Sequence, residues 1–225
     1  MVFKRILGVF KSKKEILVVS NIVCSCSFWR SNSFKPRLAN SAFYLYNFLV
    51  TSILGLSAFY HDSAAALIQD GKIIAAAQEE RFSRKKNDSS YPFQSVEYVL
   101  REGKLRLSEI DYIVFYEKPF LKFERLLETY VAFAPKGFKS FSTSMPLWLR
   151  EKLFQKKMIF NHLRSHDENF RDMNKIYFSE HHLSHAASAF YPSPFKNATI
   201  LTLDGVGEWA TTTVAKGNDQ NLEIL

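Results

Sequence analysis

Three of the six histidines in this chain lie within five positions, at His181, His182 and His185. If the surrounding segment is helical, His181 and His185 are one turn apart and project from the same face. Two imidazoles on one face can bind a first-row divalent metal ion. Residues 201–209 then have the pattern of a buried strand that ends in an acidic, glycine-rich turn. The sequence therefore predicts a metal site in which Asp204 supplies a third, oxygen ligand.

A second histidine pair, His162 and His166, has the same one-turn spacing, so spacing alone does not identify a metal site. The sequence around this pair is polar and charged, whereas a metal site needs a structured and partly dry environment. Around His181 and His185 the neighbours are small, which allows another backbone segment to approach closely. We therefore interpret the first pair as surface or structural residues and predict function for the second.

The segment Tyr60-His61-Asp62 lies in an expected turn between two strands and offers acid–base chemistry. A neutral His61 imidazole can take a proton from a hydroxyl, while the adjacent Asp62 carboxylate orients the ring. A His-Asp pair in a turn is also common without a catalytic role. The pair by itself is therefore a candidate base and no more.

Two further segments offer phosphate-binding groups. Residues 79–86 pass from acidic to basic side chains, a pattern that usually marks a solvated loop. Arg84 and Lys86 can nevertheless bind phosphate oxygens beside a metal. The turn at residues 204–207 lacks the Lys-Ser/Thr of a Walker motif and the third glycine of a dinucleotide fingerprint. We expect instead a hairpin tip at which the backbone amides of Gly205 and Gly207 can face a phosphate.

Composition and charge narrow the class of protein. With 225 residues, of which 47% are hydrophobic, the chain can bury a packed core, and global disorder is excluded. The net charge of +8 suggests nucleic acid or membrane as a partner, but residues 1–51 carry +7 of it. We therefore expect no nucleic acid and no membrane among the partners. Both cysteines, Cys24 and Cys26, also lie in this first segment, so the body has no thiol for a disulfide, which favours a cytoplasmic location.

Residues 1–51 differ in composition from the rest of the chain, and the change near Ile53 is the best domain boundary. A secretory signal over residues 11–24 and a membrane span over residues 38–60 are two alternatives for this segment. Polar residues interrupt the second stretch, and its last part serves better as the first strand of the body. We expect residues 1–51 to be a poorly ordered extension without a part in the chemistry, and residues 52–225 to form the functional domain.

The body alternates short apolar runs with segments of helical periodicity, which predicts an α/β fold with a mixed sheet. Asp70-Gly71 is a strong hairpin signal between two of the runs. Residues 133–175, with two prolines and a glycine, are interpreted as a helical insertion. The expected strands cover residues 53–57, 63–69, 72–78, 110–116, 175–178, 198–203 and 210–215, and the expected helices cover residues 93–102, 120–132 and the histidine segment.

Four segments, taken in order, closely resemble the O-carbamoyltransferases of nodulation-factor and antibiotic biosynthesis. They are residues 53–67, 79–86, 180–190 and 204–209. The resemblance implies a first domain of the actin-like ATPase (ribonuclease H-like) type, similar to the tRNA threonylcarbamoyl-transfer proteins. In that family a smaller second domain makes carbamoyl adenylate from carbamoyl phosphate and ATP. The first domain then passes the carbamoyl group to a hydroxyl of a small-molecule acceptor.

The resemblance also assigns roles to residues at matching positions. It implies that His181, His185 and Asp204 bind iron (Fe²⁺) or a similar divalent metal ion. It further implies that His61 deprotonates the acceptor hydroxyl and that Lys86 contacts the nucleotide. Such a site is physically coherent, because a metal ion near the phosphate and carbonyl oxygens stabilises negative charge while the base activates the nucleophile.

Members of this family are much longer than the present chain, which covers only part of the first domain. We expect a further aspartate ligand, the second half of the nucleotide cleft and the adenylate-forming domain to lie outside this sequence. On this view the actin-like domain is incomplete here, and the chain alone is inactive or nearly so. A C-terminal half encoded separately would then be its partner.

Three alternative hypotheses remain from the residues themselves. An actin-fold sugar kinase or ATPase would share the early hairpin and the later glycine turn, but it gives the histidines no task. A non-catalytic fragment or binding module from a split gene would need no intact site. A simple metallohydrolase built on His181 and His185 would lack the glutamate base usually placed between such histidines, where Leu183 and Ser184 stand.

Overall fold

The computed structural model describes residues 51–151, 154–205 and 207–225. The expected extension over residues 1–51, with its candidate signal segment, lies outside these residues apart from Thr51. The candidate span at residues 38–60 is a β-strand from Ser52 to Ser57 where it enters the described chain. Among the described residues, no helix combines the length and the apolar character that crossing a bilayer requires.

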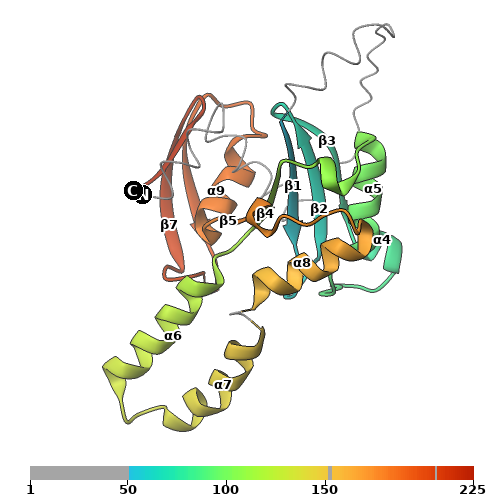
Figure 1. Cartoon of the computed structure of the whole chain (residues 1–225). Helices are drawn as coiled ribbons and strands as arrows, with labels where there is room; N and C mark the ends of the chain where they lie inside the picture. Colours follow the sequence, from blue (N-terminus) through green and yellow to red (C-terminus); the bar gives the residue numbers. More distant parts are fainter. Residues whose placement is uncertain (1–50, 152–153, 206) are drawn as a thin grey trace, which may run out of the picture.

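A five-stranded mixed sheet forms the centre of the fold (Figure 1). Its strands lie in the order β3-β2-β1-β4-β5, with β1 antiparallel to β2 and parallel to β4. The predicted α/β class with a mixed sheet is thus confirmed. Asp70 and Gly71 join β2 to β3 with positive φ angles of 48° and 74°, as the hairpin signal predicts. The strands are β1 (Ser52–Ser57), β2 (Ala64–Gln69), β3 (Lys72–Gln78), β4 (Tyr112–Phe115) and β5 (Ile176–Phe178).

Helices α5 (Phe93–Gly103) and α8 (Gln155–His166) pack against the main core of this sheet. In α5, Val96 and Val99 are fully buried and lie on the face that contacts β2 and β3. A one-turn helix, α4 (Glu80–Ser83), joins β3 to α5. The opposite side of the sheet carries a second cluster of buried residues, among them Ile53, Ala64 and Val114, and Tyr191, which follows the histidine helix, packs against it.

The segment between β4 and β5 is helical (Figure 1). Helices α6 (Pro119–Phe133) and α7 (Phe138–Glu151) form an arm that extends away from both sheets, whereas α8 returns to the core. Tyr130 of α6 stacks on Phe141 of α7 with 4.0 Å between ring centroids, which joins the two helices of the arm. The predicted insertion at residues 133–175 therefore contains one helix of the arm and one helix of the core.

A second, three-stranded sheet lies beside the histidine helix α9 (His181–Phe190). It consists of β6 (Asn197–Leu203), β7 (Thr212–Asn218) and β8 (Asn221–Ile224), all antiparallel. A Cβ atom at Gly217 would lie 2.5 Å from the Phe190 ring, so only glycine lets α9 approach β7 this closely. The predicted hairpin of β6 and β7 is confirmed, and β8 is an element that the sequence pattern did not predict.

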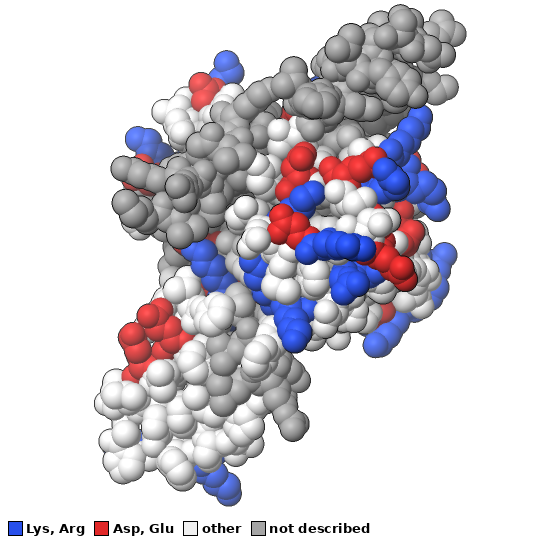
Figure 2. All heavy atoms as spheres, viewed as in Figure 1, with Lys and Arg blue, Asp and Glu red and all other residues white. Residues whose placement is uncertain are grey.

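Charged side chains are mixed on the face of the molecule that Figure 2 shows. Lys and Arg lie among Asp and Glu there, and much of the arm surface carries neither sign. This mixture agrees with the small net charge that remains once the first segment is set aside. The expectation that nucleic acid is not a partner stays a prediction.

Candidate metal centre

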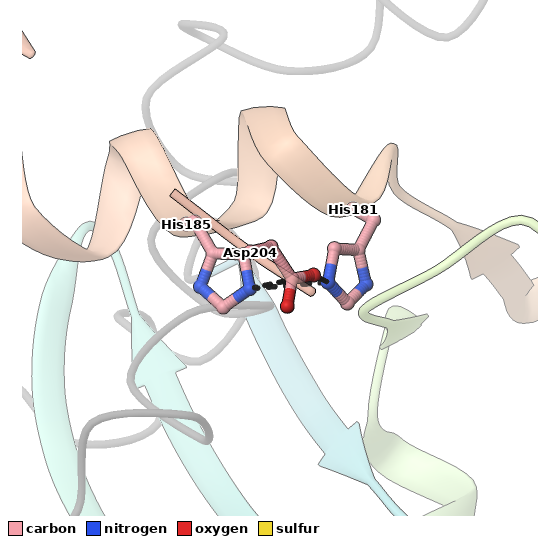
Figure 3. A group of neighbouring side chains, drawn as sticks. All are labelled: His181, His185 and Asp204. Atoms are coloured by element: carbon pink, nitrogen blue, oxygen red, sulfur yellow. Dashed lines mark hydrogen bonds and ion pairs between the residues drawn. The ribbon is translucent and has the colours of Figure 1, made fainter. Parts of the chain in front are cut away.

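Three side chains from two elements converge between α9 and the end of β6 (Figure 3). His181 Nε2 lies 2.7 Å from Asp204 Oδ2 and 3.1 Å from His185 Nε2. His185 Nε2 lies 4.0 Å from the same oxygen of Asp204. One ligand atom of each residue is thus within 4.8 Å of the other two. Two imidazole nitrogens and a carboxylate oxygen are a donor set for a first-row divalent metal.

The sequence of α9 explains how the two imidazoles reach this point. His181 and His185 are one turn apart on the helix, so both project from the same face, as predicted. On another face, the hydroxyl of Ser184 donates to the backbone oxygen of Tyr116 at 3.0 Å and fixes the helix against the end of β4. Ala186 and Ala187 are fully buried, and such small side chains let the helix pack closely against β6 and β7.

The hairpin tip turns one oxygen of Asp204 toward the imidazoles. Asp204 Oδ1 accepts a hydrogen bond from the Gly205 amide at 2.7 Å, which leaves Oδ2 for the histidines. The Gly207 amide donates to the Ala210 carbonyl at 3.2 Å. Both glycine amides therefore stabilise the turn that holds the carboxylate. Their contact with a phosphate stays a prediction.

The electrostatics of the site favour the ligand forms of His185 and Asp204. Burial, and then the neighbouring His181, hold the pKa of His185 below its usual 6.5. Burial tends to raise the pKa of Asp204, but hydrogen bonds from His181 and Gly205 and the charges of the histidines outweigh it, and the pKa is lowered from 3.8. A neutral imidazole beside an ionised carboxylate is the protonation state that metal binding requires.

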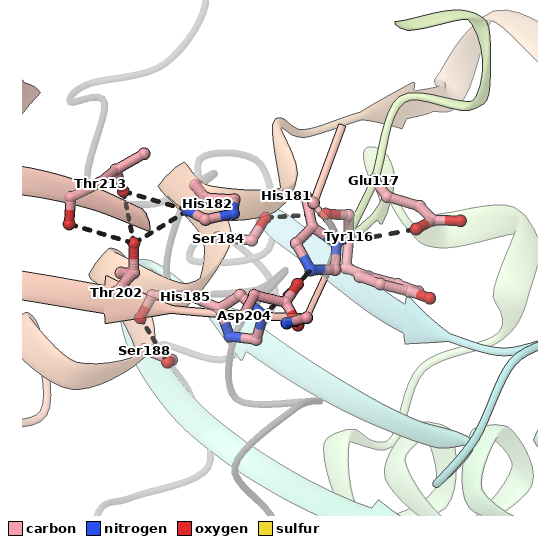
Figure 4. Close-up of polar contacts among 12 residues, drawn as sticks. Tyr116, Glu117, His181, His182, Ser184, His185, Ser188, Thr202, Asp204 and Thr213 are labelled. Atoms are coloured by element: carbon pink, nitrogen blue, oxygen red, sulfur yellow. Dashed lines mark hydrogen bonds and ion pairs between the residues drawn. The ribbon is translucent and has the colours of Figure 1, made fainter. Parts of the chain in front are cut away.

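His182, between the two candidate ligands, has a structural role (Figure 4). Its Nδ1 lies 3.0 Å from Thr202 Oγ1 and 3.2 Å from Thr213 Oγ1, so it joins α9 to β6 and β7. A Cβ atom at Gly207 would lie 2.4 Å from the His182 ring, which explains why glycine stands at that position of the hairpin tip. This contact fixes the distance between the helix and the tip that carries Asp204.

Sequence reasoning missed a buried acidic residue beside the site. Glu117, which follows β4, is 1% exposed and places Oε2 3.7 Å from His181 Nδ1. The same oxygen is hydrogen-bonded to the ammonium group of Lys122 on α6. Only the fold brings these residues together, because Glu117 and His181 lie on different elements. The sequence offered one indication of Glu117. It follows a predicted strand that ends near residue 116, and residues at strand ends often line functional sites.

Glu208 is a second buried acid that the sequence did not single out. Its Oε1 accepts a hydrogen bond from the Lys118 amide at 2.6 Å, and the side chain of Lys118 pairs with Glu180 at 2.6 Å. Burial raises the pKa of Glu208, while the amides of Lys118 and His181 oppose this rise. The residue therefore ties the hairpin tip both to the start of α9 and to the segment after β4.

His61 and the two predicted phosphate-binding residues lie in the neighbouring loops. His61 Nδ1 contacts Asp62 Oδ2 at 2.9 Å, and the histidine side chain is 56% exposed. Asp62, Arg84 and Lys86 line one groove of about 440 Å³. Arg84 occupies a left-handed conformation, with φ of 58°, where α4 ends. The predicted orientation of His61 by Asp62 is present, and the roles of His61, Arg84 and Lys86 stay predictions.

The other histidine pair has a different environment from the one the sequence suggested. His162 stacks on Tyr91 with 4.6 Å between ring centroids, and His166 stacks on Phe93 at 4.0 Å. The wholly polar neighbourhood expected for this pair was wrong, because α8 turns both rings toward aromatic side chains, the buried Tyr91 and the exposed Phe93. The structural interpretation of the pair agrees with this packing.

Comparison with known proteins gives a consistent result. Residues 52–225 match the family model described as "Carbamoyltransferase N-terminus". An uncharacterized protein of Synechocystis, sll1178, is 56% identical over 174 residues, which cover 77% of this chain and 28% of that protein. The nodulation protein NolNO of Sinorhizobium fredii is 34% identical over 170 residues, covering 74% of this chain and 23% of NolNO. An uncharacterized protein of Methanocaldococcus jannaschii, MJ1051, is 29% identical over 165 residues, covering 73% and 24%.

The chain spans about a quarter of the length of these curated relatives. The match to the family model begins at Ser52, next to the boundary that composition indicates, and contains all the candidate site residues. The chain therefore belongs to the carbamoyltransferase family, with residues 52–225 in its N-terminal domain.

Proposed function

We propose that residues 52–225 form the metal-binding part of an ATP-dependent carbamoyltransferase domain that passes a carbamoyl group to a substrate hydroxyl. The group would come from carbamoyl phosphate by way of carbamoyl adenylate. One observation carries the proposal: His181, His185 and Asp204 converge in a chain of the carbamoyltransferase family. The sugar-kinase and ATPase hypotheses give this convergence no task.

The donor set fits Fe²⁺ or a similar divalent ion, as the resemblance implies. Nε2 of each histidine and Oδ2 of Asp204 face one another (Figure 3). The side chains of His185 and Asp204 are 35% and 29% exposed, so a substrate can reach this side of the site. Three protein ligands with an open side are typical of catalytic rather than structural metal sites. When bound, the ion would stabilise negative charge on phosphate and carbonyl oxygens.

His61 is the proposed general base. Asp62 holds the Nδ1 side of the ring, which leaves Nε2 to accept the proton of an acceptor hydroxyl. The exposure of His61 leaves room for a small-molecule acceptor.

Arg84 and Lys86 are the proposed binding residues for nucleotide or carbamoyl phosphate. They lie in the groove that begins at Asp62, beside the proposed base. A guanidinium and an ammonium group in one groove suit phosphate oxygens. Gly205 and Gly207 form the backbone of the hairpin tip that carries Asp204. We propose them as further residues of this phosphate-binding site.

The strand order supports the actin-like assignment that we propose for the domain. In the order β3-β2-β1-β4-β5, β2 alone runs opposite to the other four strands. On this proposal the remaining parts of the carbamoyltransferase, which the longer relatives carry, supply the rest of the nucleotide cleft and the adenylate-forming domain. A separately encoded C-terminal half would be one such partner. We place the reaction in the cytoplasm, because the body of the chain has no cysteine.

Metal analysis after anaerobic loading with Fe²⁺ tests the proposal. We expect about one ion per chain in wild type and in the control His162→Ala, and almost none in His181→Ala and His185→Ala, because each loses one of three ligands. Loaded wild type should also bind carbamoyl phosphate more tightly than the metal-free chain, as measured by calorimetry. Equal iron content in all four proteins, or equal affinity for carbamoyl phosphate with and without iron, would contradict it.

A further inference from the structure

Among the described residues, the buried nitrogen on the far side of His181 has no hydrogen-bond partner. His181 uses Nε2 toward Asp204 and His185, while its Nδ1 is buried without a partner among the described residues. The nearest carboxylate oxygen that the structure places beside it is Glu117 Oε2, at 3.7 Å (Figure 4). This distance is longer than a hydrogen bond. A buried N–H without an acceptor costs free energy. The placement of His181 Nδ1 near the Glu117 carboxylate, but beyond hydrogen-bond distance, therefore requires an explanation.

A metal ion on Nε2 would determine where the proton of this ring lies. A neutral imidazole carries one proton, and a nitrogen that binds a metal must offer its lone pair instead. The proton of His181 would then lie on Nδ1, which faces Glu117. Metal-bound histidines commonly donate this second N–H to a carboxylate, which fixes the ring and makes it a stronger ligand.

The surroundings of Glu117 keep a carboxylate available for that purpose. The side chain is 1% exposed, so water does not compete for it. Lys122 of α6, whose side chain is 15% exposed, is paired with the same Oε2 atom. A cation beside a buried carboxylate favours its ionised form, which accepts hydrogen bonds best.

We infer that Glu117 is a positioning residue, whose carboxylate accepts the Nδ1–H of His181 when Nε2 of that ring binds a divalent metal ion. The inference rests on the metal centre proposed above and adds a residue outside the ligand set. Glu117 contacts neither substrate nor metal in this role. It acts on affinity through the orientation and basicity of His181.

Anaerobic Fe²⁺ titrations of wild type, Glu117→Gln and Glu97→Gln test the inference. Glu97 is a matched control, because its carboxylate also lies beside a histidine Nδ1. It contacts Nδ1 of His166, which belongs to the other histidine helix, α8, at 2.6 Å. We expect Glu117→Gln to bind Fe²⁺ about ten- to a hundredfold more weakly than wild type, and Glu97→Gln to stay within about twofold. Thermal unfolding of each variant reports whether it is folded.

Nitrogen-15 NMR of the Zn²⁺-loaded chain gives a readout that a merely structural role would not move. In wild type, Zn²⁺ should bring out a downfield, slowly exchanging Nδ1 proton of His181. In Glu117→Gln this resonance should move upfield and exchange faster. If the variant does not fold, the wild-type spectrum alone decides, and the absence of a hydrogen-bonded Nδ1 proton overturns the inference.

The outcomes separate the two proposals. Unchanged Fe²⁺ affinity in folded Glu117→Gln overturns the role of Glu117 and leaves the metal centre intact. A wild-type chain that takes up neither Fe²⁺ nor Zn²⁺ overturns the metal centre and, with it, the inference.

Discussion

Helices α8 and α9 each carry two histidines one turn apart, yet they place them in opposite surroundings. On α8, His162 and His166 stack on Tyr91 and Phe93 and belong to the aromatic edge of the core. On α9, His181 and His185 turn their Nε2 atoms toward Asp204. The comparison shows that spacing brings two imidazoles together, whereas the element packed opposite decides whether they can bind a metal.

The carboxylates that contact the two histidine pairs, Glu97 and Asp204, also differ in their surroundings. Glu97 contacts His166 through one nitrogen at 2.6 Å and is 54% exposed. Asp204 faces both of its histidines and is held by the hairpin tip. In the part of the chain that the structure describes, the three residues at 181, 185 and 204 are the group whose ligand atoms gather closely enough for one ion.

The largest difference between the two histidine pairs should appear in Fe²⁺ affinity when the carboxylate that contacts each pair is removed. We expect Asp204→Ala to weaken Fe²⁺ binding by more than about a hundredfold, since losing a ligand costs more than losing an outer partner. Glu97→Ala should leave the affinity unchanged. Calorimetric or competition titrations measure both, and similar losses in the two variants would remove the distinction between the helices.

Truncating a ring on α8 should affect stability instead of metal binding. The side chain of His166 is 1% exposed and packs on Phe93. We expect His166→Ala to lower the free energy of unfolding by about 1–2 kcal/mol, because a buried ring and its packing are lost. Urea unfolding gives this value, and iron content is the control. A stable variant that has lost its iron would reverse the roles of the two pairs.

We expect a smaller effect in the dependence of folding stability on pH. Histidines of both helices should contribute to it as long as no metal is bound. Burial, as the largest cause, lowers the pKa of His162, His182 and His185 below 6.5. The unfolded chain then binds more protons than the folded chain just below that pH, so stability falls as the pH drops through 6.5. Urea unfolding of the metal-free chain at several pH values measures this slope.

Single substitutions show which histidines cause the pH dependence. His162→Gln and His185→Gln should each reduce the slope of the unfolding free energy against pH. Zn²⁺ should stabilise wild type and His162→Gln at neutral pH and lose its effect in acid, because protons compete for the ligands. It should not stabilise His185→Gln. Stabilisation of all three proteins by Zn²⁺ would place the ion elsewhere.

The sequence predicted the parts of the site that depend on local pattern. Helical spacing together with small neighbouring side chains identified His181 and His185, and the apolar run before the Asp-Gly turn identified Asp204 at a strand end. The hairpins of β2 with β3 and of β6 with β7 followed from the turn residues that join short apolar runs. In each case the determining interactions are close in sequence, and such interactions can be read from pattern.

The remaining features depend on residues that are far apart in the chain. Glu208 accepts from the amide of Lys118, 90 positions away, and Glu97 contacts His166 across 69 positions. Neither contact has a local signature, because each exists only after helices and hairpins have packed together. The aromatic setting of α8 was mistaken for a polar one for this reason.

X-ray absorption at the iron edge of the loaded wild-type chain shows directly which groups bind the ion. We expect scattering from two imidazole rings and from an oxygen ligand in the first shell, since His181, His185 and Asp204 converge on one point. One ring fewer should appear in any iron retained by His185→Ala. A first shell without imidazole scattering, or a spectrum identical in wild type and this variant, would contradict it.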